Sequence, residues 1–191
     1  MSSIKGTRTE QNLLKAFAGE SQARSRYTYY AEQAAEEGLN RIAEIFLETA
    51  ENELEHARVF FSFLEGGMVE INAAYPAGPI GDTTKNLIAA AAGEHEEWHD
   101  LYPEFARIAD EEGFREVAKA FKMVAKVEKE HEARYLALRD VVEAGKVFEK
   151  DAVVRWKCRV CGHIHESTKA PNECPVCKVG REEYEIAAEN W

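Results

Sequence analysis

The segment ELEH at residues 53–56 returns as EKEH at residues 128–131, and this repeated Glu-x-x-His pattern predicts the fold. Side chains three residues apart lie on one face of a helix, so each pair can hold one metal ion. A second repeat, AGE at residues 18–20 and 92–94, has nearly the same offset, 74 residues against 75. The chain is therefore predicted to be a duplicated helical hairpin with a pseudo-twofold site between its halves.

Helix-forming residues dominate the sequence around these segments. Four amphipathic helices are expected over residues 9–37, 40–65, 83–112 and 114–144. Very short turns join the first two helices and the last two, whereas the crossover 66–82 is long and rich in Gly, Pro and Ala. Two antiparallel hairpins with one long crossover form a ferritin-like four-helix bundle. Pro103 lacks a backbone donor, so we expect a kink in the third helix.

Every predicted helix carries glutamate on the face that should form the core. These inward-facing residues are Glu20, Glu53, Glu94, Glu97 and Glu128. A third Glu-x-x-His pair, Glu96 and His99, is expected to face solvent. Glu96 lies about 200° around the helix from Glu94 at ~100° per residue. The duplication is uneven at one point, because the counterpart of Glu97 is Ala23.

Five carboxylates in one core predict a metal centre. A buried carboxylate without a partner costs several kcal/mol, so the bundle needs cations to hold five of them. His56 and His131 fit as neutral imidazole ligands. Carboxylates with some imidazole favour iron or manganese over zinc. One Glu from each of two helices, with Glu-x-x-His from the other two, is the arrangement of ferritin-like di-iron carboxylate proteins.

Two tyrosines lie near these acids. Tyr27 and Tyr102 follow Glu20 and Glu94 by one to two helical turns, on the same sides of their helices. They are equally consistent with ordinary core tyrosines whose hydroxyls are satisfied. If they lie at the metal centre, their expected role is to donate hydrogen bonds to ligand carboxylates.

The C-terminal part of the chain predicts a second metal site. All the cysteines of the chain lie there, in two Cys-x2-Cys pairs separated by 12 residues: Cys158, Cys161, Cys174 and Cys177. This spacing indicates a tetrahedral thiolate site, which can hold zinc or iron. Trp156, Gly162 and the segment CPVC at 174–177 resemble rubredoxin, which favours iron. Lys178 departs from the glycine usual in rubredoxins, and the spacer is shorter than theirs.

Composition limits the remaining function classes. The chain has 191 residues, 45% of them apolar, which is enough for a hydrophobic core. Its net charge of −11 argues against binding to nucleic acid or a membrane surface. The N-terminal sequence has no apolar signal core, so we expect a cytoplasmic protein. We also expect two domains, 1–150 and 151–191.

Together these motifs resemble the rubrerythrin family over nearly the whole chain. The residues that carry the resemblance are Glu20, Glu53, His56, Glu94, Glu97, Glu128, His131 and the four cysteines. The resemblance implies a ferritin-like di-iron domain followed by a rubredoxin-like Fe(Cys)4 domain. It implies three iron ions per chain, two of them in an oxo-bridged di-iron site.

The resemblance also implies roles for single residues. Glu53 and Glu128 would bridge the two irons, and the remaining glutamates and His131 would be terminal ligands. His56 and Glu97 would exchange on one iron as the redox state changes, which matches the uneven duplication at Glu97. Tyr27 and Tyr102 match tyrosines beside the site in that family.

The function implied is that of a non-haem peroxidase that reduces hydrogen peroxide to water and protects against oxidative stress. Its electrons would pass through the Fe(Cys)4 centre. The sequence has no nucleotide-binding motif, so the donor would be a rubredoxin or a separate NAD(P)H-dependent reductase. A homodimer or larger homo-oligomer is expected. A ferroxidase, or an iron-storage protein with a structural zinc ribbon, stays open as an alternative.

Overall fold

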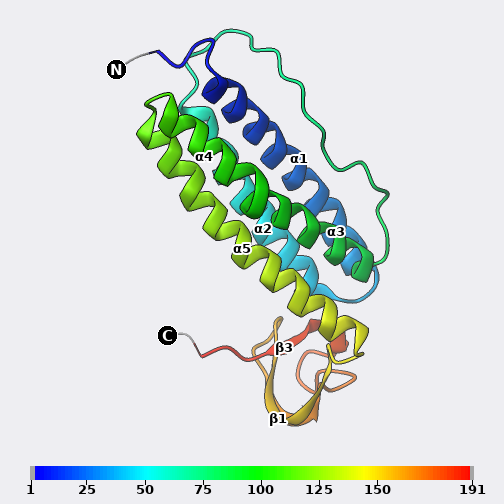
Figure 1. Cartoon of the computed structure of the whole chain (residues 1–191). Helices are drawn as coiled ribbons and strands as arrows, with labels where there is room; N and C mark the ends of the chain where they lie inside the picture. Colours follow the sequence, from blue (N-terminus) through cyan, green and yellow to red (C-terminus); the bar gives the residue numbers. More distant parts are fainter. Residues whose placement is uncertain (1–2, 190–191) are drawn as a thin grey trace.

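The computed structural model describes residues 3–189, which form a long helical bundle with a small β-sheet module at one end (Figure 1). Two helical hairpins lie side by side, as the duplication predicts. A single crossover between them, residues 63–82, runs along the outside of the bundle (Figure 1). The helical elements are α1 (Arg8–Glu36), α2 (Asn40–Ser62), α3 (Thr83–Glu96), η1 (Glu97–Leu101), α4 (Tyr102–Glu111) and α5 (Arg115–Glu143).

The third predicted helix is divided rather than continuous. The segment η1 is a π-helical turn between α3 and α4, and the Tyr102 N–H donates to the Glu97 carbonyl five residues back. Pro103 has no N–H, so the carbonyl of His99 loses its ordinary partner four residues on. The irregularity therefore lies just before the proline, and it is a widened turn that begins at Glu97. Such turns often occur at functional sites.

The apolar core is split into two clusters by the acidic residues. One cluster includes Tyr27, Phe46 and Tyr135, and the other includes Phe60 and Phe121. On each long helix the inward-facing glutamate lies between the residues of these clusters. The hydrophobic effect therefore closes the bundle above and below the site, and fixes the helices that carry the acids.

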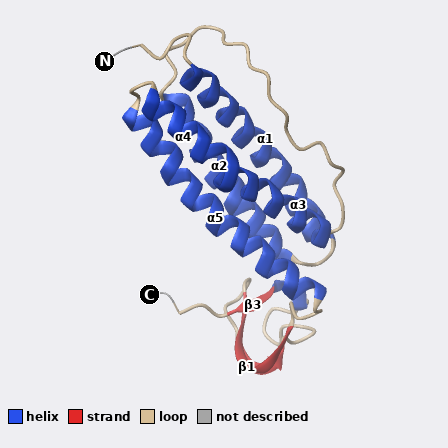
Figure 2. Ribbon diagram, viewed as in Figure 1, coloured by secondary structure: helices blue, strands red, loops and turns tan. Residues whose placement is uncertain are grey.

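The C-terminal module is a three-stranded antiparallel sheet in the order β2-β1-β3, coloured red in Figure 2. Its elements are β1 (Glu149–Cys158), β2 (Ile164–Lys169), η2 (Arg181–Glu183) and β3 (Tyr184–Ile186). Trp156 and Tyr184 form its core with Cys158 and Cys174. Arg159 of the module is ion-paired with Glu44 of α2, which ties the module to the end of the bundle.

No helix within residues 3–189 is long and apolar enough to cross a membrane.

Candidate metal centres

Two groups of potential ligands meet in the middle of the bundle. Within each group the ligand atoms all lie within 4.8 Å of one another. The first group is Glu20, Glu53, His56 and Glu128, and the second is Glu53, Glu94, Glu128 and His131. Glu53 and Glu128 belong to both groups, so two adjacent ion sites would share these two carboxylates.

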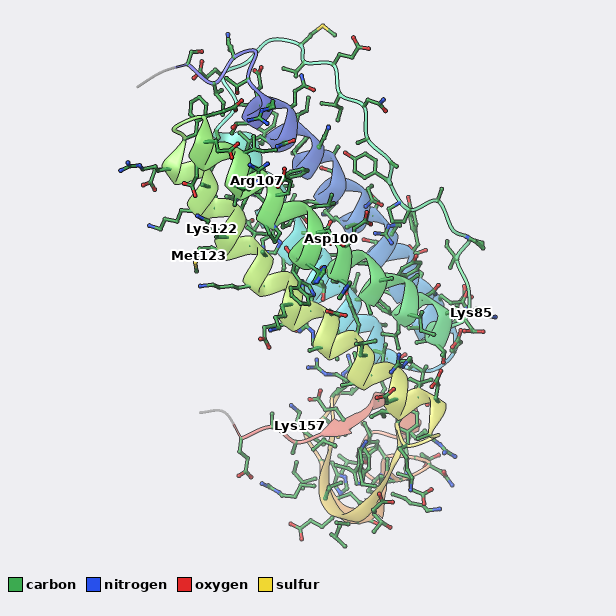
Figure 3. The ribbon with its side chains drawn as sticks, viewed as in Figure 1. Lys85, Asp100, Arg107, Lys122, Met123 and Lys157 are labelled. Carbon is green, nitrogen blue, oxygen red and sulfur yellow. The ribbon has the colours of Figure 1, made fainter. Side chains whose placement is uncertain are left out.

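The helical period explains how these side chains meet. Glu53 and His56 lie on one face of α2, and Glu128 and His131 lie on one face of α5. His56 Nδ1 lies 2.8 Å from both Glu53 Oε2 and Glu128 Oε1. By contrast, Lys122, labelled in Figure 3, is a surface residue of α5, and its Nζ donates to Asp110 Oδ2 of α4 at 2.6 Å.

Several of the buried ligand atoms lack a hydrogen-bond partner, and this tests whether metal ions fit the site. Both carboxylate oxygens of Glu128 are buried without a hydrogen bond, as are Glu20 Oε2, Glu53 Oε1 and Glu94 Oε2. His131 Nδ1 lies 2.9 Å from Glu128 Oε2 but is not aligned with it as a hydrogen bond. Buried polar atoms are rarely left unsatisfied. Oxygens and imidazole nitrogens that converge without pairing are therefore suited to hard or intermediate cations such as iron.

The pKa values of these buried groups show that, without metal ions, the site favours protonated side chains. Burial is the largest effect and raises the pKa of Glu20 and Glu97 well above the usual range, and neighbouring carboxylates add to it. Burial, then the charge of Glu53, raises the pKa of Glu94 to about 8. Burial lowers the pKa of His131, but nearby carboxylates, Glu128 first, outweigh it and raise that pKa to about 12. The site therefore needs positive charge, supplied either by protons or by metal ions.

The two tyrosines contact ligand carboxylates across the hairpins. The Tyr27 hydroxyl of α1 donates to Glu94 Oε1 of α3 at 2.6 Å. The Tyr102 hydroxyl donates to Glu20 of α1. Each tyrosine therefore donates to a glutamate on the other hairpin. In the sequence, each tyrosine is closer to the glutamate of its own hairpin. All four side chains are almost completely buried.

Glu97 lies beside the two groups and belongs to neither of them. Its carboxylate is on the π-turn η1 and faces α1, where a Cβ on Gly19 would lie 3.8 Å from Glu97 Oε1. The positive charge of Arg26 lowers the pKa of Glu97, against the larger effect of burial. The sequence does not single out Arg26, because an isolated arginine on a helix forms no recognisable motif.

The residues expected to face solvent do so. Glu96 and His99 are both exposed, as the helical phase predicts. His95 and Trp98 contact Glu132 on the outside of the bundle.

The four cysteine sulfurs of the C-terminal module form a third ligand group. Cys158 Sγ lies 3.7 Å from Cys177 Sγ, and Cys161 Sγ lies 3.6 Å from Cys174 Sγ. A tetrahedral thiolate site with metal–sulfur bonds of about 2.3 Å spaces its sulfurs by roughly 3.8 Å. The sulfurs are therefore already placed for one ion. None of them forms a disulfide.

Comparison with known proteins identifies both parts of the chain. The family model described as Rubrerythrin matches residues 11–139, and the model described as Rubrerythrin, rubredoxin-like domain matches residues 156–185. A curated rubrerythrin of Porphyromonas gingivalis is 62% identical over 92% of this chain and 88% of its own length. A curated rubrerythrin of Nitratidesulfovibrio vulgaris is 51% identical over the full length of both chains.

The solved structures agree with this comparison. The chain is similar to nigerythrin in its fully reduced, all-ferrous state, with a TM-score of 0.64 and 30% identity over 97% of this chain and 92% of that one. The expected ferritin-like bundle and rubredoxin-like module are therefore confirmed. The ligand groups in both parts are positioned for the three iron ions that the resemblance implies.

Proposed function

Since the chain belongs to the rubrerythrin family, we propose that it is a peroxidase that reduces hydrogen peroxide to water at a di-iron site. The observation that carries this proposal is the pair of ligand groups that share Glu53 and Glu128. Two metal ions that share carboxylates lie close enough to act on both oxygens of one small molecule. When bound, two ferrous ions supply the two electrons that, with two protons, convert one hydrogen peroxide into two waters.

We propose the following ligand roles. Glu53 and Glu128 would hold both ions, because they are the members common to both groups. Glu20 and His56 complete one site, and Glu94 and His131 complete the other. Glu97, whose carboxylate lies beside the groups, would take the place of His56 as a ligand when the redox state changes.

The side chains around the ligands hold this arrangement in place. The hydroxyls of Tyr27 and Tyr102 donate to Glu94 and Glu20, which fixes one oxygen of each carboxylate and leaves the other free. Partners of this kind orient metal ligands. The apolar clusters pack above and below the site and fix the helices that carry its ligands. Burial, then the charge of Glu94, raises the pKa of the Glu97 carboxyl well above its usual range.

The cysteine module is proposed as a one-electron centre that returns electrons to the di-iron site. It lies beyond one end of the bundle in its own chain (Figure 1), whereas the carboxylates lie in the middle. This separation favours transfer from the module of a second copy, in a homodimer or larger assembly. The external donor is a rubredoxin or an NAD(P)H-dependent reductase.

The test is anaerobic stopped-flow of the fully reduced, iron-loaded protein with one equivalent of hydrogen peroxide. The ferric-thiolate absorbance of the cysteine site is followed. We expect this band to return faster with peroxide than with dissolved oxygen. A Glu97→Gln variant keeps the shape of the side chain but removes its charge, and should slow the return.

Two outcomes contradict the proposal. If oxygen restores the band faster than peroxide does, a ferroxidase is the better description. If the cysteine site purifies with zinc and no band forms, the electron relay is wrong and an iron-storage protein with a zinc ribbon becomes the leading alternative.

A further inference from the structure

A cavity of about 310 Å³ lies on the Glu97 side of the metal centre. Its walls come from α1, from the end of α3 with η1, and from the crossover, which contributes residues 72–76. Glu97 and Tyr102 are among its lining residues, and Tyr102 is almost completely buried. Glu97 is a proposed ligand and Tyr102 holds another, so this cavity reaches the edge of the site from the outer surface.

Both glycines of the repeated AGE segments line this cavity, Gly19 from α1 and Gly93 from α3. Glycine inside a helix destabilises it by roughly 0.5–1 kcal/mol relative to alanine. A Cβ on Gly93 would lie 3.6 Å from Arg26 Nη2, which is ordinary contact. Neither glycine has a positive φ. Backbone conformation therefore does not require glycine at either position, and a larger side chain there would take up space in the cavity.

Tyr75 of the crossover covers the cavity at Gly19. Its hydroxyl donates to the carbonyl oxygen of Lys15, one turn before Gly19, at 2.8 Å. A Cβ on Gly19 would lie 3.6 Å from Tyr75 Cε1 and 3.8 Å from Glu97 Oε1. The aromatic ring and the carboxylate therefore both lie next to the bare backbone of Gly19, and all three residues line the cavity.

The polar groups in the wall suit a small hydrogen-bonding molecule. Arg26 is held by Gln22, whose Oε1 accepts from Arg26 Nε at 2.6 Å. Arg26 Nη1 is buried without a partner. Both residues line the cavity. A small molecule with a donor and an acceptor at each end, such as hydrogen peroxide, can accept a hydrogen bond from Arg26 and donate one to Glu97.

We infer that this cavity is the route by which substrate reaches the metal centre, and that Tyr75 and Gly19 restrict it to hydrogen peroxide and similarly small molecules. This inference rests on the proposed function, and it adds two specificity-determining residues outside the ligand set. Tyr75 narrows the entrance, and the missing side chain at Gly19 leaves it open.

The first experiment measures access without turnover. The probe is azide, a linear three-atom anion, and its binding rate to the oxidised, iron-loaded protein is followed by absorbance. Gly19→Val adds an isopropyl group, which is three carbon atoms, and should slow azide binding by at least about tenfold, the lower end of the effect of a single methylene in a pocket. Ser25→Val adds the same side chain to an exposed position of α1 outside the cavity, and should leave the rate unchanged.

The second experiment measures selectivity. Tyr75→Ala should raise kcat/KM for tert-butyl hydroperoxide relative to hydrogen peroxide by about tenfold. Tyr75→Phe keeps the ring and should stay as selective as the original protein. Tyr29→Ala removes an exposed tyrosine that does not line the cavity, and should have no effect on selectivity.

The outcomes separate this inference from the proposed function. If Gly19→Val keeps its iron and binds azide at the original rate, substrate enters elsewhere and the inference is wrong. If Gly19→Val does not fold, an unchanged selectivity in Tyr75→Ala overturns it instead. If the unmodified protein reduces no peroxide but azide binding slows in Gly19→Val, the proposed function fails and the access route stands.

Discussion

Tyr27 and Tyr102 each donate a hydrogen bond to a carboxylate on the opposite hairpin, so single hydroxyl groups connect the two halves of the site. Tyr102→Phe removes one donor and keeps the ring. We expect affinity for ferrous ions to fall by about 10–100-fold, as for other residues that orient metal ligands. Competition with a calibrated chelator measures this change.

The control is Tyr30→Phe. Tyr30 is buried in the same aromatic cluster, with its ring centre 6.2 Å from that of Tyr27, and belongs to neither ligand group. It should bind iron as tightly as the unmodified protein. Equal losses in Tyr30→Phe and Tyr102→Phe would mean that packing, and not the hydrogen bond, supports the ligands.

Lys178 adopts a left-handed backbone conformation directly after the fourth cysteine, with φ 67°. This conformation costs an L-residue roughly 1–2 kcal/mol, and glycine avoids that cost. It also explains why rubredoxins use glycine at this position. Lys178→Gly should stabilise the metal-loaded module by about 1 kcal/mol. The gain is smaller than the full strain, because glycine makes the unfolded chain more flexible and so increases the entropy lost on folding.

Loss of the ferric-thiolate absorbance with rising denaturant measures this stability. Lys178→Ala is the matched variant, because it removes the exposed contact with Glu173 but keeps a Cβ at the strained position. It should not stabilise the module. A gain equal to that of the glycine variant would show that strain at this residue is not the cause.

At the scale of elements, α1 begins with a defined cap. The Thr7 hydroxyl accepts from the Glu10 N–H at 3.1 Å, and Glu10 Oε2 accepts from the Gly6 N–H at 2.7 Å. Thr7→Ala removes the cap and should lower the free energy of unfolding by about 1 kcal/mol. Urea denaturation measures it, with Thr7→Ser as the variant that keeps the hydroxyl. An unchanged midpoint in Thr7→Ala would show that the first turn of α1 is held by tertiary contacts alone.

The π-turn η1 shows where a regular helical period stops predicting which side chains face the core. A period of 3.6 residues correctly places Glu94 in the core and Glu96 in solvent, because both precede the turn. Glu97 begins the turn and lies beside the ligand groups. A pattern that assumes a regular helix has no means to anticipate this widened turn.

At the scale of the whole molecule, the buried acids make the metal-free protein sensitive to pH. In the fold, burial and Glu53 raise the pKa of Glu94 to about 8, against 4.5 for the free side chain. Burial lowers the pKa of His56, but its contacts with Glu128 and Glu53 outweigh burial and raise that pKa from 6.5 to about 10. The folded state therefore keeps protons that the unfolded chain has already released.

Stability from Glu94 is fully present below pH 4.5 and is lost as the pH rises to about 8. Stability from His56 is lost between pH 6.5 and about 10. We expect urea denaturation of the metal-free protein to show a fall of about 1.4 kcal/mol per pH unit for each group. The iron-loaded protein should show no such fall, because metal ions replace the protons. A metal-free protein equally stable at pH 5 and pH 9 would contradict this.

The sequence by itself determined the fold class and the candidate ligands. Glu53 with His56, and Glu128 with His131, are local pairs set by the helical period, and the duplication predicts that they face one another. The Cys-x2-Cys pairs are equally local, and their sulfurs meet as expected.

Only the tertiary structure decided which groups meet across the helices. It placed Glu53 and Glu128 in both ligand groups, paired Tyr27 with Glu94, and enclosed a cavity between Gly19 and Tyr75. The physical reason is that a repeating pattern defines the face of one helix and not its neighbours. Those depend on helix packing and on the course of the crossover, which join residues far apart in the chain.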